Sequence, residues 1–169
     1  MLKSIIKSKK AIGRNAFKRL TGMSPIPDIA TLANKSWQEL RNLTISQVQW
    51  FENRTIGFTL NDNQSCKAGS KVNFKSIHNF DPAKKITKVE CIIDDSLHFV
   101  EQINFYSYKE ILVRVGWTEE VGKYYGGKEV FDIAEDEQLI GCELDHCKRI
   151  FRGVTWIKMK VPKADSKKK

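Results

Sequence analysis

Much of the chain over residues 45–161 alternates apolar and polar side chains, which is the pattern of half-buried β-strands. Val89, Cys91 and Ile93, for example, alternate with polar or charged neighbours. Short turn-forming sequences separate the runs: Asn61-Asp62-Asn63, Asp81-Pro82, Asp94-Asp95, Gly126-Gly127 and Arg152-Gly153. The pattern therefore predicts an all-β body.

The strand-like runs form three similar units. Each unit begins with apolar-x-x-apolar-x-apolar and continues, after a variable connection, with aliphatic-x-aromatic. The first halves begin at Ile45, Ile86 and Leu139, and the second halves are Ile56 to Phe58, Ile103 to Phe105 and Val154 to Trp156. Three repeated units predict an architecture with a pseudo-threefold axis, although the periodicity by itself also fits a β-sandwich.

The residues before this region have helical rather than alternating spacing. In residues 1–22, apolar side chains recur every three or four positions with Lys and Arg between them, which predicts a basic amphipathic N-terminal helical arm. Residues 29–43 form a shorter amphipathic segment, whose candidate packing residues are Leu32, Trp37, Leu40 and Leu43. The chain thus divides into an arm and connector (1–44), a β domain (45–161) and a basic tail (162–169).

The net charge of +9 lies outside the β domain. No acidic residue precedes Asp28, so the first 27 residues carry +7, and the tail from Pro162 carries +3. Residues 28–161 therefore have a net charge of −1. A protein that binds a nucleic-acid backbone across its folded surface has an excess of cations there. Because residues 28–161 have no such excess, nucleic acid is not an expected partner.

The basic arm has two interpretations. An amphipathic, basic start without acidic residues is typical of a mitochondrial transit peptide, and it equally fits an arm that docks on a partner. An uncleaved targeting arm that also docks satisfies both interpretations. Such an arm suits acidic protein subunits or an anionic lipid surface. The residues expected to dock are Lys7, Lys10, Arg14, Phe17, Lys18 and Arg19.

No candidate catalytic or metal site stands out. The first charges are not followed by the apolar core of a secretory signal, so the four cysteines are expected to be reduced thiols. Cys91 and Cys142 alternate with aliphatic residues, which indicates core positions rather than metal ligands. His78 and His98 have no recognisable nucleophile context, and Glu135–Glu137 fits a solvated turn. The sequence predicts no enzyme activity, metal or cofactor.

One stretch carries a family resemblance. Phe131, Ile133, Glu137, Leu139 and Cys142 have the spacing of the F-x-L-x-x-x-E-x-I-x-x-V segment of jacalin-like lectin domains. Similar matches lie at Gly126-Gly127, Ile103 to Phe105 and Val154 to Trp156. The resemblance covers residues 45–161 and implies a β-prism of three four-stranded Greek-key sheets, which fits the three units.

The resemblance also implies where a sugar would bind. In that family a G-x-x-x-D loop just before the last strand supplies a carboxylate and close backbone N–H groups to sugar hydroxyls. The matching positions are His146 and Ile150, so neither the Gly nor the Asp is present. Gly141 to Asp145 does spell G-x-x-x-D, but it lies too early, within the preceding strand. The sugar loop is degenerate, and carbohydrate is not the expected partner.

These observations predict a non-catalytic accessory or scaffold subunit of a large assembly, with other protein subunits as its partners. The transit-like arm indicates a mitochondrial respiratory-chain complex. The alternatives are a microtubule-associated inner structural protein of an axoneme in the cytoskeleton, a carbohydrate-binding lectin, and a ribosome-associated protein.

Overall fold

The computed structural model describes residues 5–7, 32, 34–51, 55–68, 74–94, 100–116, 125–147 and 150–161. Its elements are β1 (Ile5–Lys7), α2 (Trp37–Asn42), β2 (Ile45–Phe51), β3 (Thr55–Leu60), β4 (Ser65–Ala68), β5 (Phe74–Asn79), β6 (Lys88–Asp94), β7 (Val100–Ser107), β8 (Glu110–Gly116), β9 (Tyr125–Asp132), β10 (Glu137–Cys147) and β11 (Ile150–Lys160). The predicted all-β body is confirmed. None of the helices in the described part of the chain has the length and apolar character of a membrane span.

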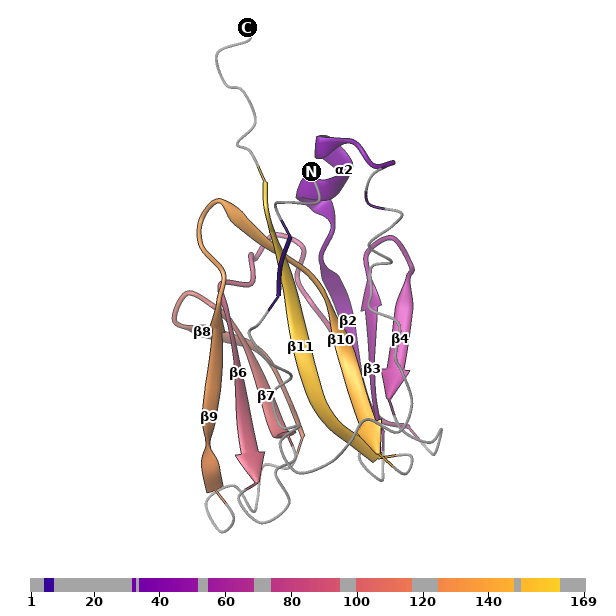
Figure 1. Ribbon diagram of the computed structural model, residues 1–169, viewed down its shortest axis with the longest axis vertical. Coiled ribbons are helices and arrows are strands. Elements are labelled where there is room, and N and C mark those ends of the chain that lie inside the picture. Colours follow the sequence, from indigo (N-terminus) through magenta and orange to yellow (C-terminus); the bar gives the residue numbers. More distant parts are fainter. Residues whose placement is uncertain are drawn as a thin grey trace, which may run out of the picture.

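The strands form three sheets that surround a common core (Figure 1). Sheet B has the order β4-β3-β2-β5 and sheet C the order β8-β7-β6-β9. In both, the fourth strand in sequence returns to lie beside the first, which is the Greek-key connection. Sheet A has the order β1-β11-β10, so the N-terminal strand takes the place that β4 and β8 take in the other two sheets.

The three sequence units coincide with the three sheets. Their first halves become β2, β6 and β10, and their second halves become β3, β7 and β11. The apolar-x-x-apolar spacing has a structural cause at two of these strand starts. A bulge inserts Ser46 after Ile45 in β2, and another inserts Ile140 after Leu139 in β10. One extra residue shifts the alternation, so that the next apolar side chain again reaches the core.

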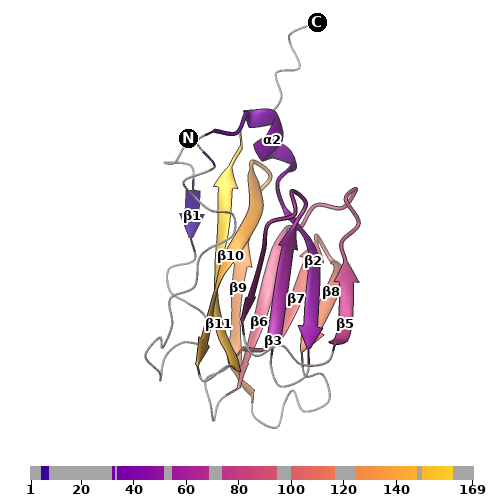
Figure 2. The same cartoon turned by 90° about the vertical axis from the view of Figure 1, so that its right-hand side faces the viewer.

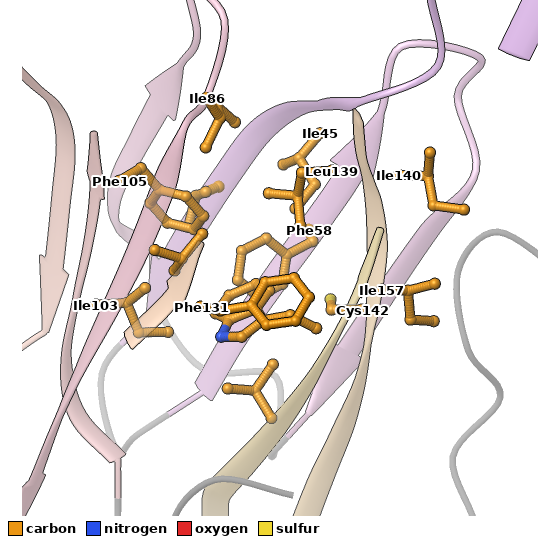
Figure 3. Close-up of a cluster of buried hydrophobic side chains, with 14 of the residues drawn as sticks. Ile45, Phe58, Ile86, Ile103, Phe105, Phe131, Leu139, Ile140, Cys142 and Ile157 are labelled. Atoms are coloured by element: carbon orange, nitrogen blue, oxygen red, sulfur yellow. The ribbon is translucent and has the colours of Figure 1, made fainter. Parts of the chain in front are cut away.

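Three aromatic residues meet in this core, one from each sheet. They are Phe58 on β3, Phe105 on β7 and Trp156 on β11, and they occupy the aromatic position of the three units. The ring centroids of the three pairs are 6.2, 5.7 and 5.6 Å apart, all in edge-to-face geometry, which suits the quadrupole of each ring. All three side chains are fully buried. We call them the aromatic triad; Figure 3 labels Phe58 and Phe105.

Other equivalent positions of the three units are buried in the same way. They are Ile45, Ile86 and Leu139; Val48, Val89 and Cys142; and Ile56, Ile103 and Val154. Figure 3 shows several of these side chains pointing into the space between the sheets. The pseudo-threefold repeat of the sequence is therefore a repeat of core positions.

Residues 5–7 differ from the prediction, because they form strand β1 instead of a helix. β1 pairs antiparallel with β11, with Ile5 opposite Met159 and Lys7 opposite Ile157 (Figure 2). Adjacent Ile5 and Ile6 are β-branched and favour a strand, and the pairing covers an edge of β11. The rest of the predicted helical arm lies outside the described residues.

Two predicted turns are also strands. Gly126 and Gly127 begin β9, and Gly153 lies inside β11. Gly153 is opposite Asp145, next to an irregularity in the β10–β11 register. A glycine in a strand often marks such a bulge rather than a turn. The predicted packing residues of the connector are confirmed, since Leu32, Leu40 and Leu43 are buried and Trp37 packs against the core.

The carboxylate of Glu137 joins the β9–β10 turn to β11. Its Oε1 accepts hydrogen bonds from Lys158 Nζ and from the backbone N–H of Ala134, both at 2.8 Å. Lys158 Nζ also donates to the carbonyl oxygen of Asp132 at 2.8 Å. Burial would raise the pKa of the Glu137 carboxyl, but the bonds from Lys158 and Ala134 outweigh it and lower the pKa below its ordinary value.

Replacing Glu137 by Gln is expected to destabilise the protein by about 1.5–3 kcal/mol near neutral pH, because it breaks a buried charged hydrogen bond. A carboxyl whose pKa is lower in the folded state stabilises that state above its unfolded pKa, about 4.3, and loses this contribution as pH falls through the folded value. Urea unfolding of both proteins across acidic pH checks this. Asp136→Asn, at an exposed site on the same turn, is the control. A difference between wild type and Glu137→Gln that does not change with pH would contradict the assignment.

Gly116 ends β8 with φ of +109°, and a Cβ there would lie 2.2 Å from the carbonyl oxygen of Glu101. Gly127 has a similar φ of +116°, but a Cβ would meet no atom within 4 Å. Both Ala substitutions should lower the free energy of unfolding by about 1–3 kcal/mol, because a residue with a Cβ rarely adopts a positive φ. Gly116→Ala should lose clearly more free energy of unfolding than Gly127→Ala, because the backbone of β7 must also move. Equal losses in urea titrations would show that the close approach is unimportant.

Candidate functional site

The predicted docking residues lie mostly outside the described part of the chain. Lys7 belongs to β1, where its backbone pairs with Ile157. Lys10, Arg14, Phe17, Lys18 and Arg19 fall in the range 8–31, outside the described residues. The described residues on either side of that range belong to the folded body. Lys7 is in sheet A, and Leu32 is fully buried in the core.

The positions that match the sugar loop of jacalin-like lectins lie at strand ends. His146 pairs with Phe151, and Cys147 pairs with Ile150 across the β10–β11 hairpin. Only residues 148 and 149 separate the two strands. Gly141 to Asp145, the G-x-x-x-D match, lies within β10 and pairs with β11, as the sequence spacing predicts.

Cys91 and Cys142 are fully buried, which confirms the predicted core positions. Burial raises the pKa of the Cys91 thiol to about 12, although a hydrogen bond with Trp156 acts in the opposite direction. Burial and, next, a hydrogen bond with half-buried Cys66 raise the pKa of Cys142. Cys66, Cys91 and Cys142 are free thiols. Thiols with raised pKa values are poor nucleophiles and metal ligands, so Cys91 and Cys142 act as core side chains.

The remaining candidate groups are dispersed. His78 Nε2 lies 3.1 Å from Ser76 Oγ, two residues away in the same strand, β5. Of the Glu135–Glu137 run, Glu135 and Asp136 are exposed as predicted, whereas Glu137 is buried with Lys158. The structure therefore does not bring His78 and the carboxylate run into one site among the contacts it describes.

The outer face of sheet C has a polar network centred on Asn104, which is 1% exposed. Its Nδ2 donates to Glu90 Oε1 and Gln102 Oε1, both at 3.1 Å, and its Oδ1 accepts from Arg114 Nε at 2.9 Å. Both amide hydrogens are thus used within the sheet. This network fixes three strands to one another and accounts for the polar residues buried there.

A cleft of about 480 Å³ lies at the α2 end of the molecule. Its walls come from the end of α2, the start of β2, the β3–β4 turn, the β5–β6 connection and the start of β10. The lining residues are Arg41, Asn42, Thr44, Ile45, Ser46, Asn61, Phe80, Asp81, Pro82, Ala83, Lys84, Lys85, Ile86, Gln138 and Leu139. The sequence pattern does not predict this cleft. The available signal was the equivalence of Ile45, Ile86 and Leu139, which all line it.

Side-chain amides hold the walls of this cleft together. The N–H of Thr44 donates to Asn61 Oδ1 at 3.1 Å, and Asn61 Nδ2 donates to the carbonyl oxygen of Asn42. Gln138 Nε2 donates to the carbonyl oxygen of Leu43 at 3.1 Å. These bonds tie the end of α2 to the β3–β4 turn and to β10, so the walls are fixed relative to each other.

The rim of the cleft is mainly cationic, with Arg41, Lys84 and Lys85 against Asp81. Lys84 Nζ lies 2.6 Å from Glu110 Oε1, and this hydrogen bond and the Glu110 charge raise the pKa of the lysine. Lys85 Nζ instead donates to the carbonyl oxygens of Ala134 and Glu135 at 2.7 and 3.0 Å. These acceptors are neutral, so they orient the ammonium group without cancelling its charge.

Comparison with known proteins identifies the fold. No protein-family model and no curated protein sequence matches the chain. Among solved structures, the agglutinin of Calystegia sepium aligns with a TM-score of 0.50 and 11% identity over 70% of this chain and 84% of its own. The biofilm matrix protein Bap1 of V. cholerae aligns with a TM-score of 0.42 and 16% identity over 69% of this chain and 22% of its own. The similarity to the Calystegia agglutinin, together with three sheets around one core, shows that the chain has a jacalin-like fold.

Proposed function

We propose that the protein is a non-catalytic structural subunit that docks into a larger assembly through the basic segments flanking its β domain. The separation of charge supports this proposal most directly: residues 1–27 carry +7 and residues 162–169 carry +3, whereas residues 28–161 carry −1. A partner that selects this chain by charge would contact the flanking segments rather than the sheets.

The way the arm is attached gives further support. β1, which precedes residues 8–31, is paired with β11, and Leu32, which follows them, is buried in the core. The basic residues 8–31 are therefore tethered to the folded body at both ends. Tethering limits the freedom that the segment loses on binding and raises the effective concentration of its charges at a partner surface.

An acidic protein surface or an anionic lipid surface has the charge that this arm requires. The transit-like composition of the arm favours a mitochondrion and, within it, an accessory role in a membrane respiratory complex. Tethered basic segments also suit the acidic surface of a microtubule, so an inner structural protein of an axoneme is the alternative. Locating a tagged chain in fractionated cells separates these two proposals.

Carbohydrate binding is the second alternative, and the jacalin-like fold is the observation that favours it. The placement of Gly141 to Asp145 within β10 argues against it, because this segment is a paired strand and not the loop before the last strand that carries the family's motif. Glycan-array binding by the wild type that is lost in Asp145→Ala would support a lectin over a structural subunit.

The proposal predicts that reversing two charges of the arm releases the protein from its assembly. Lys18→Glu/Arg19→Glu is expected to weaken association by at least about tenfold, since each basic residue near an anionic surface contributes about 1 kcal/mol. The measurement is the share of tagged protein that co-fractionates with high-molecular-mass complexes from its source cells.

The matched control is Lys67→Glu/Lys109→Glu, which makes the same change in net charge at two exposed residues of the β domain. It should co-fractionate like the wild type, and both variants should keep the wild-type melting temperature. Equal loss in both variants would show that net charge alone matters, and no loss in either would contradict docking through the arm.

A further inference from the structure

The cleft at the α2 end is the feature of the described structure that the proposed function leaves unexplained. It lies near the first residues of β10, whereas the β10–β11 turn, which matches the sugar loop of the lectin family, lies at the other end of this eleven-residue strand. A ligand in this cleft would therefore occupy the opposite end of the prism from that loop. The cleft needs an interpretation of its own.

The floor of the cleft is apolar and lies at the end of the pseudo-threefold core. Ile45, Ile86 and Leu139, the equivalent first residues of the three units, all line it, and Figure 3 shows them together at the upper end of the buried cluster. Phe80 adds an aromatic wall, held edge-to-face against Phe105 at a centroid distance of 5.1 Å. Because Ile45 and Leu139 are 0% and 1% exposed, an aliphatic or aromatic group entering the cleft would bury its surface mainly against Phe80 and Ile86.

The mouth of the cleft has the opposite character. It carries three cationic side chains and one carboxylate. Asp81 Oδ1 accepts the backbone N–H of Ala83 at 2.9 Å, so this carboxylate is already used in the turn that forms the mouth. Lys84 is paired with Glu110, whereas Lys85 is held by two neutral carbonyl oxygens beside Ile86. A positive group fixed next to an apolar floor favours a negatively charged head group.

We propose that this cleft binds a small organic anion with an apolar body, its head group at Lys85 and Arg41 and its body against Phe80 and Ile86. The volume of about 480 Å³ is within the range of small-molecule sites. Hydrogen bonds from the side-chain amides of Asn61 and Gln138 hold the walls of the cleft in place without a ligand, so little ordering is needed on binding. The head group is a carboxylate or a phosphate, since both have the same charge complementarity with the mouth.

Titration with 8-anilinonaphthalene-1-sulfonate, an aromatic anion that fluoresces in apolar sites, tests this proposal on the full chain. One saturable site is expected. Lys85→Gln and Arg41→Gln should each weaken its affinity about five- to tenfold, and Lys67→Gln and Lys109→Gln, at exposed lysines elsewhere, should leave it unchanged. Ala83→Trp fills the mouth from an exposed position and should abolish binding without affecting the fold, which keeps the test valid if a charge variant unfolds.

Competition then identifies the head group. Dodecanoate or dodecyl phosphate should displace the dye, and the more effective of the two gives the natural head-group class, while dodecanol at equal concentration should displace little. The proposal is overturned if no saturable site exists, if the two control variants weaken binding as much as Lys85→Gln, or if dodecanol competes as well as the anions. None of these outcomes depends on the basic arm, so failure here leaves the proposed docking function untouched.

Discussion

The structure depends on the mutual edge-to-face contact of three aromatic rings, Phe58, Phe105 and Trp156. Each ring comes from a different sheet, and all three pairs are in contact, so the sheets are fixed to one another at a single point of the core. Rings in this arrangement gain electrostatic energy beyond the area they bury, and only a limited set of sheet positions satisfies three such pairs at once. The aliphatic-x-aromatic motif therefore recurs three times in the sequence because each sheet supplies one ring to this contact.

The core positions repeat in all three units, whereas the segments at the α2 end of the core do not. Ile45, Ile86 and Leu139 continue the threefold arrangement to the α2 end, where segments outside the sequence repeat bury them. The connector, the β5–β6 connection and Gln138 differ between units, and they form the walls of a cationic cleft. β1 pairs with β11, so the basic N-terminal residues are joined in sequence to a folded body whose net charge is close to zero.

Local patterns were sufficient to predict the three units and the core positions of Cys91 and Cys142, because a strand with one buried face alternates within its own few residues. The expectation of a jacalin-like fold rests instead on the resemblance of residues 131–142 to a segment of that family. Residues 5–7 were missed because helical spacing around them competes with pairing to β11, about 150 residues away in sequence. The cleft was missed because its walls come from residues near 41–46, 80–86 and 138–139, whose proximity exists only in the folded chain. The sequence pattern predicts a solvated position for Glu137, because its partner Lys158 is distant in sequence.

The aromatic triad holds the three sheets together through its three pairwise ring contacts. Double-mutant cycles with Phe58→Leu, Phe105→Leu and Trp156→Leu, read from urea unfolding, test it most directly. The triad predicts a favourable coupling energy of about 0.5–1.5 kcal/mol for each of the three pairs. Coupling in only one or two pairs, with the remaining pair additive, would contradict a threefold aromatic centre.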